Sequence, residues 1–320
     1  MTKKTTFRID LEECTNQRCV QCKNAKERGS HIENDLCKDA ISEIDKLPTR
    51  CVGDWGYQKI YRLVQYFGIF SKGMHKKWSG LNYVEVCSGP GRCVMRNNGQ
   101  EINGTVLAIL KHPSFQSYLK QAIFIDYNSE TVDVLNKRIE RTALKGKARA
   151  VCVDFNDIAS LEREISHLGQ RSLNLVLIDP TECNVPFLSI KTIAKFLKNV
   201  DFIVNIASGT DIRRNIQKAI LNTSFSRVRD KYEDFLGVNK CLQEEKIQKI
   251  AQRKNLDLLM KEVMSIYKRS WRGIGYNNFS EKPVEHYYNL MFASKSSMGL
   301  KFWDKANIYD YDGQKTFWGV

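Results

Sequence analysis

Five short apolar runs, separated by helix-length amphipathic stretches, most constrain how this chain folds. The runs are rich in β-branched residues and cover residues 83–87, 122–126, 150–154, 173–179 and 201–207. Between them, apolar side chains recur at helical spacing, as over 129–141, 158–168 and 186–199. Strands that are apolar along their whole length and alternate with helices indicate a parallel sheet covered on both faces. The sequence therefore predicts an α/β protein with a doubly wound, Rossmann-like sheet.

The flanking segments predict the domain organisation. A helix over 57–70 leads into the first strand, and the apolar run 285–293 is expected to join the sheet as an antiparallel strand. The first 45 residues are polar and rich in cysteine. We therefore expect a Cys-rich segment at 1–45, and then one Rossmann-like domain at 46–320 with a helical basic insertion at about 211–272.

Charge and hydropathy narrow the class of partner. The chain has 320 residues and a net charge of +14, which favours a polyanion such as nucleic acid. No stretch approaches the roughly 18 apolar residues of a membrane span. The first six residues have no apolar core behind their lysines, so no secretory signal is expected. These features predict a cytoplasmic protein that does not bind membranes.

A glycine loop comes after the first predicted strand, in the sequence Ser88-Gly89-Pro90-Gly91. Glycine permits a sharp turn and lets a ligand approach backbone that a Cβ would block. A loop of this kind is common after strands, so its meaning depends on the residues at the ends of the other strands.

An acid stands directly after each of the next three strands. In a sheet of this kind, an acid at the position of Asp126 accepts hydrogen bonds from the two hydroxyls of a ribose. An acid at the position of Asp154 can accept from the exocyclic amine of a base, and Asp179-Pro180 faces the reacting end of the ligand. In such sheets, ligands bind beyond the carboxyl ends of the strands. Any one of these acids could simply cap the next helix or turn. Their order after the glycine loop nevertheless predicts a cofactor site.

S-adenosylmethionine fits this loop better than a dinucleotide does. The loop lacks the third glycine of G-x-G-x-x-G, Asp126 comes 35 residues after Gly91 instead of about 20, and no Walker lysine comes after it. Glu85 within the first strand is also typical of the adenosylmethionine pattern. We therefore expect Glu85, Ser88, Gly89, Gly91, Asp126 and Asp154 to bind S-adenosylmethionine.

The acceptor side is predicted at Asp179, Pro180 and Glu182. Asp179 would orient an acceptor amine, and Glu182 either acts as a general base or is only solvated. Enzymes that methylate a base amine place an aromatic side chain beside the flipped base. Here Thr181-Glu182-Cys183 come directly after Asp179-Pro180, so that stacking residue is missing from its usual place.

Four of the ten cysteines lie near the N-terminus. Cys19 and Cys22 have the spacing of a zinc knuckle, and Cys14 or His31 together with Cys37 would complete four ligands. Zinc is the first expectation and an iron–sulfur cluster the second. The alternative is a disordered, thiol-rich tail.

The insertion at 211–272 carries half of the excess charge. It holds 15 Lys and Arg against eight acids, a balance of +7. We expect helices that form a basic lid and bind nucleic acid through Arg213, Arg214, Lys268, Arg269 and Arg272. Four aromatic side chains are available for base stacking, Tyr232, Phe235, Tyr267 and Trp271. The alternative is a solvated helical face whose aromatics pack inward.

The chain resembles the three-Cys-motif partner family. The resemblance covers residues 45–308 and rests on Leu47-Pro48-Thr49-Arg50, Tyr83 to Arg92, Asp179-Pro180, Asp211 to Asn215 and His286 to Lys295. It implies a class I S-adenosylmethionine methyltransferase-like fold and cofactor, and a partner protein encoded nearby that carries three cysteines. Cys14, Cys19 and Cys22 of this chain are not taken to be that partner's motif.

Together, these patterns predict an S-adenosylmethionine-dependent methyltransferase that acts on nucleic acid or a nucleic-acid-associated substrate. Two alternatives stay open: a methyltransferase that modifies a protein or peptide, and a non-catalytic scaffold that binds nucleic acid and works with a partner protein.

Overall fold

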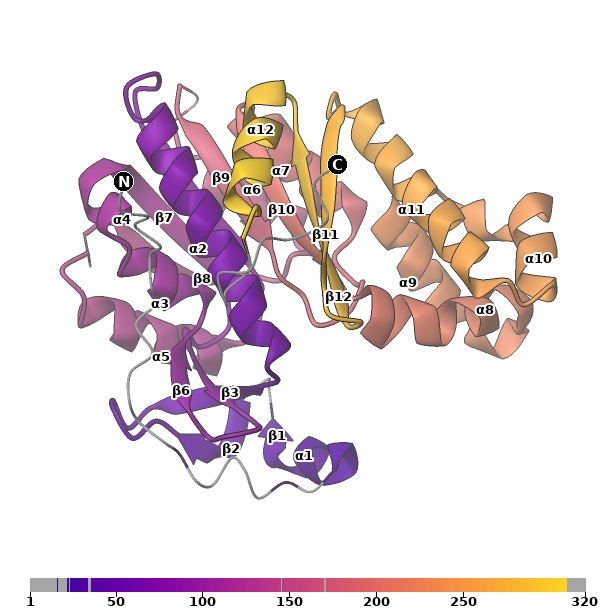
Figure 1. Ribbon diagram of the computed structural model, residues 1–320, viewed down its shortest axis with the longest axis horizontal. Helices are drawn as coiled ribbons and strands as arrows, with labels where there is room; N and C mark the ends of the chain where they lie inside the picture. The colour runs from indigo at the N-terminus through magenta and orange to yellow at the C-terminus, as the bar shows by residue number, and fades with distance from the viewer. Residues whose placement is uncertain are drawn as a thin grey trace. The chain divides into compact units, whose positions relative to one another are not determined.

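The structure, a computed structural model, describes residues 16, 22, 24–33, 36–144, 146–169 and 171–309. The chain forms two compact units, and Figure 1 labels their helices and strands. The first contains Met1–Leu81, Cys87–Cys152 and Phe302–Val320, and the second contains Asn82–Val86 and Val153–Lys301.

Most strands of the larger sheet belong to the second unit. They are β4 (Leu81–Val86), β9 (Leu173–Ile178), β10 (Val200–Ile206), β11 (Asn278–Val284) and β12 (Tyr288–Ser294), in the order β11-β12-β10-β9-β4. β9 and β10 run parallel, with Val176 opposite Phe202, and β12 runs antiparallel to β10. Every residue of β4, β9 and β10 is buried, as their apolar sequences predict.

Helices connect and cover these strands. α6 (Ile158–Ile165) packs against α7 (Phe187–Leu197), and α7 is the crossover between β9 and β10. In the first unit, β7 (Leu119–Asp126) and β8 (Ala148–Cys152) run parallel and are joined by α5 (Ser129–Glu140). Asn128 caps α5, because its side chain accepts from the Thr131 backbone N–H at 2.8 Å. These βαβ units confirm the predicted fold class, a doubly wound, Rossmann-like α/β sheet.

The first unit also contains a small sheet that the sequence did not predict. Its order is β1-β2-β3-β5-β6, with β1 (Ile32–Glu33), β2 (Leu36–Ile41), β3 (Pro48–Val52), β5 (Arg92–Met95) and β6 (Glu101–Asn103). A short helix, α1 (Ala25–His31), precedes it. The strands come from two segments far apart in sequence, so β3 and β5 pair in parallel across about 40 residues of chain.

Three further helices complete the first unit, and a fourth comes after β12. They are α2 (Trp55–Met74), α3 (Thr105–Leu110), α4 (Pro113–Tyr118) and α12 (Ser297–Ala306). Tyr66 of α2 meets Trp303 of α12 edge to face, with ring centroids 5.5 Å apart. Among the described helices, none is long and apolar enough to cross a membrane.

The predicted helical insertion lies between β10 and β11. It begins with a π-helix, η2 (Ser208–Ile212), and continues through α8 (Arg213–Leu221), η3 (Thr223–Phe225), α9 (Ser226–Leu236), η4 (Cys241–Gln243), α10 (Glu245–Gln252) and α11 (Leu256–Gly273). The sequence predicts two or three helices here, and the structure has four α-helices that pack together (Figure 1). Gly237, with φ of 70°, ends α9 in the left-handed conformation that favours glycine.

Candidate cofactor loop and acceptor-side residues

The loop after β4 holds three residues in the left-handed region. Cys87, Gly89 and Gly91 have φ angles of 64°, 63° and 87°. Cys87 is unusual there, because its Cβ makes this conformation costly for a residue other than glycine. The loop is therefore held in a conformation that its surroundings must stabilise.

Asp126, at the end of β7, holds this loop. The Gly89 N–H donates to Asp126 Oδ2 at 2.9 Å, and the Asn128 N–H donates to Oδ1 at 3.2 Å. The Ser88 N–H donates to the Ile125 carbonyl at 3.1 Å. The structure thus brings together the predicted glycine loop and the predicted ribose-binding carboxylate. A carboxylate oxygen can accept more than one hydrogen bond, so Asp126 can hold the loop and accept from a hydroxyl as well.

The two loop glycines have different surroundings. A Cβ on Gly91 would lie 2.8 Å from Leu135 Cδ1, so Gly91 permits close packing on α5. Among the described residues, a Cβ on Gly89 would meet only Arg50 Nη1, at 3.7 Å. Ser88 Oγ is buried and has no hydrogen-bond partner among the described residues. Room at Gly89 and an unused hydroxyl at Ser88 fit a bound polar cofactor.

Glu85 belongs to the second unit and is fully buried within β4. The Tyr83 hydroxyl donates to Glu85 Oε2 at 2.7 Å. Burial first, and then the Glu85 charge, raise the pKa of Tyr83 well above its usual range. The hydrogen bond between Tyr83 and Glu85 lies within β4. A role of Glu85 in binding cofactor stays a prediction.

Asp179 is held by a side chain that the sequence did not single out. The Asn205 Nδ2 group, on β10, donates to Asp179 Oδ1 at 2.9 Å and lies 3.4 Å from the Pro180 carbonyl. The Asp179 N–H donates to the Val86 carbonyl at 3.0 Å. Asn205 therefore fixes the orientation of the predicted acceptor-binding carboxylate.

Glu182 forms an ion pair with Lys231, at 3.1 Å. The Lys231 ammonium also lies 3.0 Å from Asp211 Oδ2, in the π-helix. The Cys183 N–H donates to Asp211 Oδ2 at 2.9 Å, and the Tyr232 hydroxyl donates to Oδ1 at 2.7 Å. The Asp211 network thus ties the segment after Asp179-Pro180 to the insertion.

The charge state of Asp211 is set by these contacts. Burial raises the pKa of Asp211, but hydrogen bonds from Tyr232, the Cys183 N–H and Lys231 outweigh it and lower the pKa below its usual value. Asp211 lies in a π-helix, a feature that often marks functional sites but has no simple sequence signature.

Asp154, the predicted adenine-binding residue, is exposed and lies in the second unit. Its Oδ1 accepts from the Asn156 N–H and from Asn156 Nδ2, both at 2.8 Å. This local turn is the alternative that the sequence left open, and the adenine contact stays a prediction.

A groove in the second unit was not predicted. It comprises two adjoining cavities of about 480 and 360 Å³ that share Asn156, Pro186, Asp230 and Asp234. Leu188, 57% exposed, lines the larger cavity, and Lys231 lines the smaller one. Since Pro186 and Lys231 border it, the groove lies beside the segment after Asp179-Pro180.

The cysteine prediction lies partly outside the described residues. Cys14 and Cys19 are among the residues that the structure does not describe, whereas Cys22 is half-buried and Cys37 is buried on β2. His31 Nδ1 contacts the Asp39 carboxylate. Within the described ranges, no group of three or more His, Cys, Asp or Glu residues is arranged to hold a metal.

The predicted stacking aromatics of the insertion are not on its surface. Tyr232, Phe235, Tyr267 and Trp271 are all buried. Phe235 stacks on Tyr267 with centroids 4.4 Å apart, and Trp271 meets Phe202 of β10 edge to face. The expectation that they stack on bases was wrong, because these large side chains form the core between the helices and β10.

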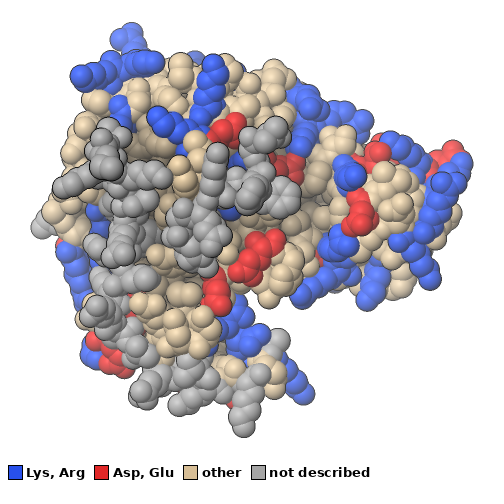
Figure 2. All heavy atoms as spheres, viewed as in Figure 1, with Lys and Arg blue, Asp and Glu red and all other residues tan. Residues whose placement is uncertain are grey.

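The basic residues of the insertion do lie on its surface, with acidic residues among them (Figure 2). Arg213 pairs with Asp257 at 2.8 Å, and Lys268 pairs with Glu281. Arg272 lies over the Phe279 ring, 5.5 Å from its centroid. Arg214 and Arg269 are exposed and form no ion pair with an acid of the described part of the chain.

No family model matches the sequence, and no curated protein matches it. Among solved structures, the fold is similar to protein LPL1258 from Legionella pneumophila, with 10% identity and a TM-score of 0.46 over 78% of this chain and 90% of that one. It is also similar to an O-methyltransferase from Bacillus cereus in complex with SAH, with 9% identity and a TM-score of 0.40 over 74% and 81%. At these identities and TM-scores, the functional argument rests on this chain's own residues.

Proposed function

We propose that the protein is an S-adenosylmethionine-dependent methyltransferase that acts on nucleic acid or a nucleic-acid-associated molecule. The observation that carries the proposal is the loop after β4, where Asp126 accepts from the Gly89 N–H; among the described residues, Ser88 Oγ has no hydrogen-bond partner and only Arg50 Nη1 would lie within 4 Å of a Cβ on Gly89. This arrangement supports a polar ligand at the carboxyl end of β4.

The proposed cofactor supplies a methyl group on a sulfonium centre. Ser88 and Gly89 would contact its polar end, and Asp126 would accept from its ribose hydroxyls, in addition to the backbone N–H groups that it already binds. Gly91 would act indirectly, because it lets the loop pack closely on α5. Asp154 and Glu85 are proposed to complete the binding of the cofactor.

The proposed acceptor residues are Asp179, Pro180 and Glu182. Asp179 would orient the acceptor atom for transfer, with its own orientation fixed by Asn205. The Pro180 carbonyl would accept a hydrogen bond from the same substrate group that receives the methyl. Glu182 would receive the acceptor's proton, in competition with its ion pair to Lys231.

Nucleic acid is the proposed acceptor class because of the exposed cations on α8 to α11. Arg214, Arg269 and Arg272 would neutralise phosphates, since each is exposed. With the insertion's aromatics buried, this contact would depend on charge, and its affinity would fall steeply with salt concentration.

Methyl incorporation tests this function. Wild type and Asp179→Ala are incubated with S-adenosylmethionine labelled in its methyl group and with DNA, RNA or protein, and the label in each acceptor is counted. With wild type, we expect label in nucleic acid. With Asp179→Ala, the rate of labelling should fall at least about tenfold, because removing an orienting group raises the activation free energy by more than about 1.4 kcal/mol. Asp157→Asn, an exposed helix cap on α6, is the matched control and should keep wild-type activity.

A protein acceptor is the second candidate. The groove beside Pro186 favours it, because the exposed Leu188 and the acids Asp230 and Asp234 suit a cationic, partly apolar peptide segment better than a phosphate backbone. Label in protein but not in nucleic acid would select this candidate. A wild type that binds cofactor yet labels no acceptor would favour the scaffold.

A zinc site and a partner protein complete the proposal. Cys14, Cys19, Cys22 and Cys37 are proposed to bind zinc, less favourably an iron–sulfur cluster, and metal analysis should find about one equivalent that Cys19→Ser with Cys22→Ser removes. We also propose that the protein acts in the cytoplasm, with the neighbouring three-cysteine protein that its family resemblance implies.

A further inference from the structure

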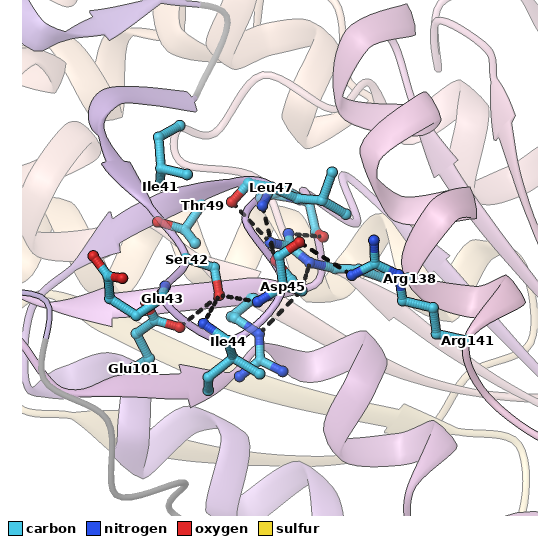
Figure 3. A network of polar contacts seen from close by, with 12 residues as sticks. Ile41, Ser42, Glu43, Ile44, Asp45, Leu47, Thr49, Glu101, Arg138 and Arg141 are labelled. Atoms are coloured by element: carbon cyan, nitrogen blue, oxygen red, sulfur yellow. Dashed lines mark hydrogen bonds and ion pairs between the residues drawn. The ribbon is translucent and has the colours of Figure 1, made fainter.

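The turn between β2 and β3 holds a buried carboxylate. The side chain of Asp45 is only 9% exposed. Arg138, on α5, donates to both of its oxygens, from Nε to Oδ2 at 2.7 Å and from Nη2 to Oδ1 at 2.9 Å (Figure 3). Two parallel bonds of this kind are the strongest arrangement of an arginine and a carboxylate.

The same guanidinium also binds the glycine loop. Arg138 Nη1 donates to the Pro90 carbonyl at 2.7 Å, and Nη2 lies 3.2 Å from the Leu47 carbonyl. Arg138 is 3% exposed, so it has no water to replace a lost partner. One side chain thus connects the turn of the small sheet to the middle of Ser88-Gly89-Pro90-Gly91.

Two further sets of contacts hold the turn in place, one through Ser42 and the other through Arg92. Ser42 Oγ donates to Glu101 Oε2 at 2.7 Å, and the Asp45 N–H donates to Ser42 Oγ at 3.2 Å (Figure 3). Arg92, the residue after the loop, lies 3.4 Å from Asp45 Oδ2 through its Nε. Although burial raises the pKa of Asp45, Arg138 outweighs it and lowers the pKa to about 2, so the carboxylate stays charged.

We propose that Asp45 and Arg138 are positioning residues that hold the Ser88–Gly91 loop in its ligand-binding conformation. The inference rests on the proposed function, because it takes this loop as the cofactor loop. The loop needs such a support, since Cys87, Gly89 and Gly91 all have positive φ and Pro90 has no N–H with which to anchor itself. Asp126 binds the loop at Gly89, and Arg138 binds it at the next residue.

Arg138→Lys isolates the positioning role. A lysine keeps the positive charge beside Asp45, but its single ammonium cannot reproduce the forked bonds to Asp45, Pro90 and Leu47. Without cofactor, amide hydrogen exchange should rise about tenfold in a peptide covering 87–92 and should be unchanged in a peptide covering β9. The dissociation constant for S-adenosylmethionine should also rise about tenfold, the equivalent of one lost buried hydrogen bond.

Arg62→Lys is the matched control. Arg62 is also a buried arginine of the first unit, and it donates to Asn307 Oδ1 at 2.8 Å. This variant should lose thermal stability to a similar extent and leave exchange in 87–92 unchanged. If exchange in 87–92 rises equally in both variants, Arg138 contributes only to overall stability and the proposal fails. If exchange in Arg138→Lys equals that of wild type, the proposal is also overturned.

The two proposals fail separately. If wild type does not bind S-adenosylmethionine but Arg138→Lys still loosens 87–92, the proposed function fails and the positioning of the loop stands. If the cofactor binds and Arg138→Lys changes neither exchange nor affinity, the positioning fails alone. Should Arg138→Lys not fold, Asp45→Asn gives the same test, because it removes the charge that orients Arg138 and keeps the shape of the side chain.

Discussion

Charged side chains are buried and paired at the β2–β3 turn, whereas on helices α8 to α11 they are mostly exposed. In the turn, the buried Asp45 carboxylate accepts two bonds from Arg138 of α5, which is also buried and donates to the Pro90 carbonyl. On the helices, basic and acidic side chains mix on the surface, and pairs such as Arg213–Asp257 lie in solvent. A buried pair determines local conformation, whereas exposed charges contribute to association and little to stability.

This difference shows what a net charge can and cannot reveal. The charge of +14 indicates a polyanionic partner, but it does not distinguish Arg138, which is enclosed, from Arg214, which is exposed. Burial and pairing make that distinction, and they predict opposite results for substitution in the two regions.

The largest effect is expected from Arg138→Met. It removes both bonds of Arg138 to the buried Asp45 carboxylate and leaves Arg92, 3.4 Å away, and the Leu47 N–H as partners, and breaking a buried pair costs about 3–5 kcal/mol of unfolding free energy. Urea unfolding followed by circular dichroism measures it. Arg141→Met is the control, because Arg141 donates to the Asp45 carbonyl at 3.1 Å from an exposed position and should cost less than about 1 kcal/mol. Equal losses would contradict the contrast between buried and exposed charge.

A pH dependence in the first unit is expected to be next in size. Burial first, and then the nearby Lys72 charge, lower the pKa of His112 from 6.5 to about 4. The unfolded chain therefore takes up this proton more readily, and stability falls as the pH falls from about 6.5 towards 4. Between pH 7.5 and pH 4.5 the loss should be roughly 2.5 kcal/mol.

His112→Asn tests the source of that loss. Asparagine preserves the helix cap that His112 provides at the start of α4, where it accepts from the Ser114 N–H, but it does not titrate. Urea unfolding at the two pH values should show a smaller loss in the variant. The same loss in both proteins would assign it to other groups.

A smaller effect is expected at Tyr232, inside the basic helices. Tyr232→Phe removes the hydrogen bond to Asp211 and should cost about 1–2 kcal/mol, because Asp211 keeps its other partners. Tyr276→Phe is the control, since the buried Tyr276 hydroxyl has no partner among the described residues and its removal should cost nothing. Affinity for nucleic acid should be unchanged in both, and a drop with Tyr232→Phe alone would show that the hydroxyl bond to Asp211 supports nucleic-acid binding.

The smallest effect on stability is expected for the exposed cations. Arg214→Ala and Arg269→Ala should each change the unfolding free energy by less than about 0.5 kcal/mol. If each neutralises one phosphate, each should lower the slope of log affinity against log salt by about 0.9 for duplex DNA. Fluorescence anisotropy with a labelled duplex at several salt concentrations measures the slope. Unchanged slopes would remove these residues from the proposed interface.

The sequence predicted the parts of the fold that repeat locally. The mostly apolar runs that became β4, β9 and β10 can be recognised in the sequence, because strands buried on both faces carry few polar residues. The small sheet escaped prediction, because β3 and β5 are short, mixed in polarity, and pair across distant segments.

The residues of the candidate site also fall into those that the sequence could predict and those that it could not. Ser88, Gly89 and Asp126 could be predicted, because each comes at the end of a recognisable strand. Arg138 could not, since it contacts Asp45 across 93 positions and looks like an ordinary surface residue of an amphipathic helix. Asn205 was not singled out, and Asp211 was named only as part of the family resemblance, because the contacts of both residues depend on which loops meet in space.

Calorimetric titration with S-adenosylmethionine, comparing wild type with Asp126→Ala, tests the central claim most directly. We expect wild type to bind one equivalent and the substitution to abolish binding, because Asp126 both anchors Gly89 and is proposed to accept from the ribose. A folded wild type that binds no S-adenosylmethionine would contradict the claim, and would leave the scaffold as the function to test.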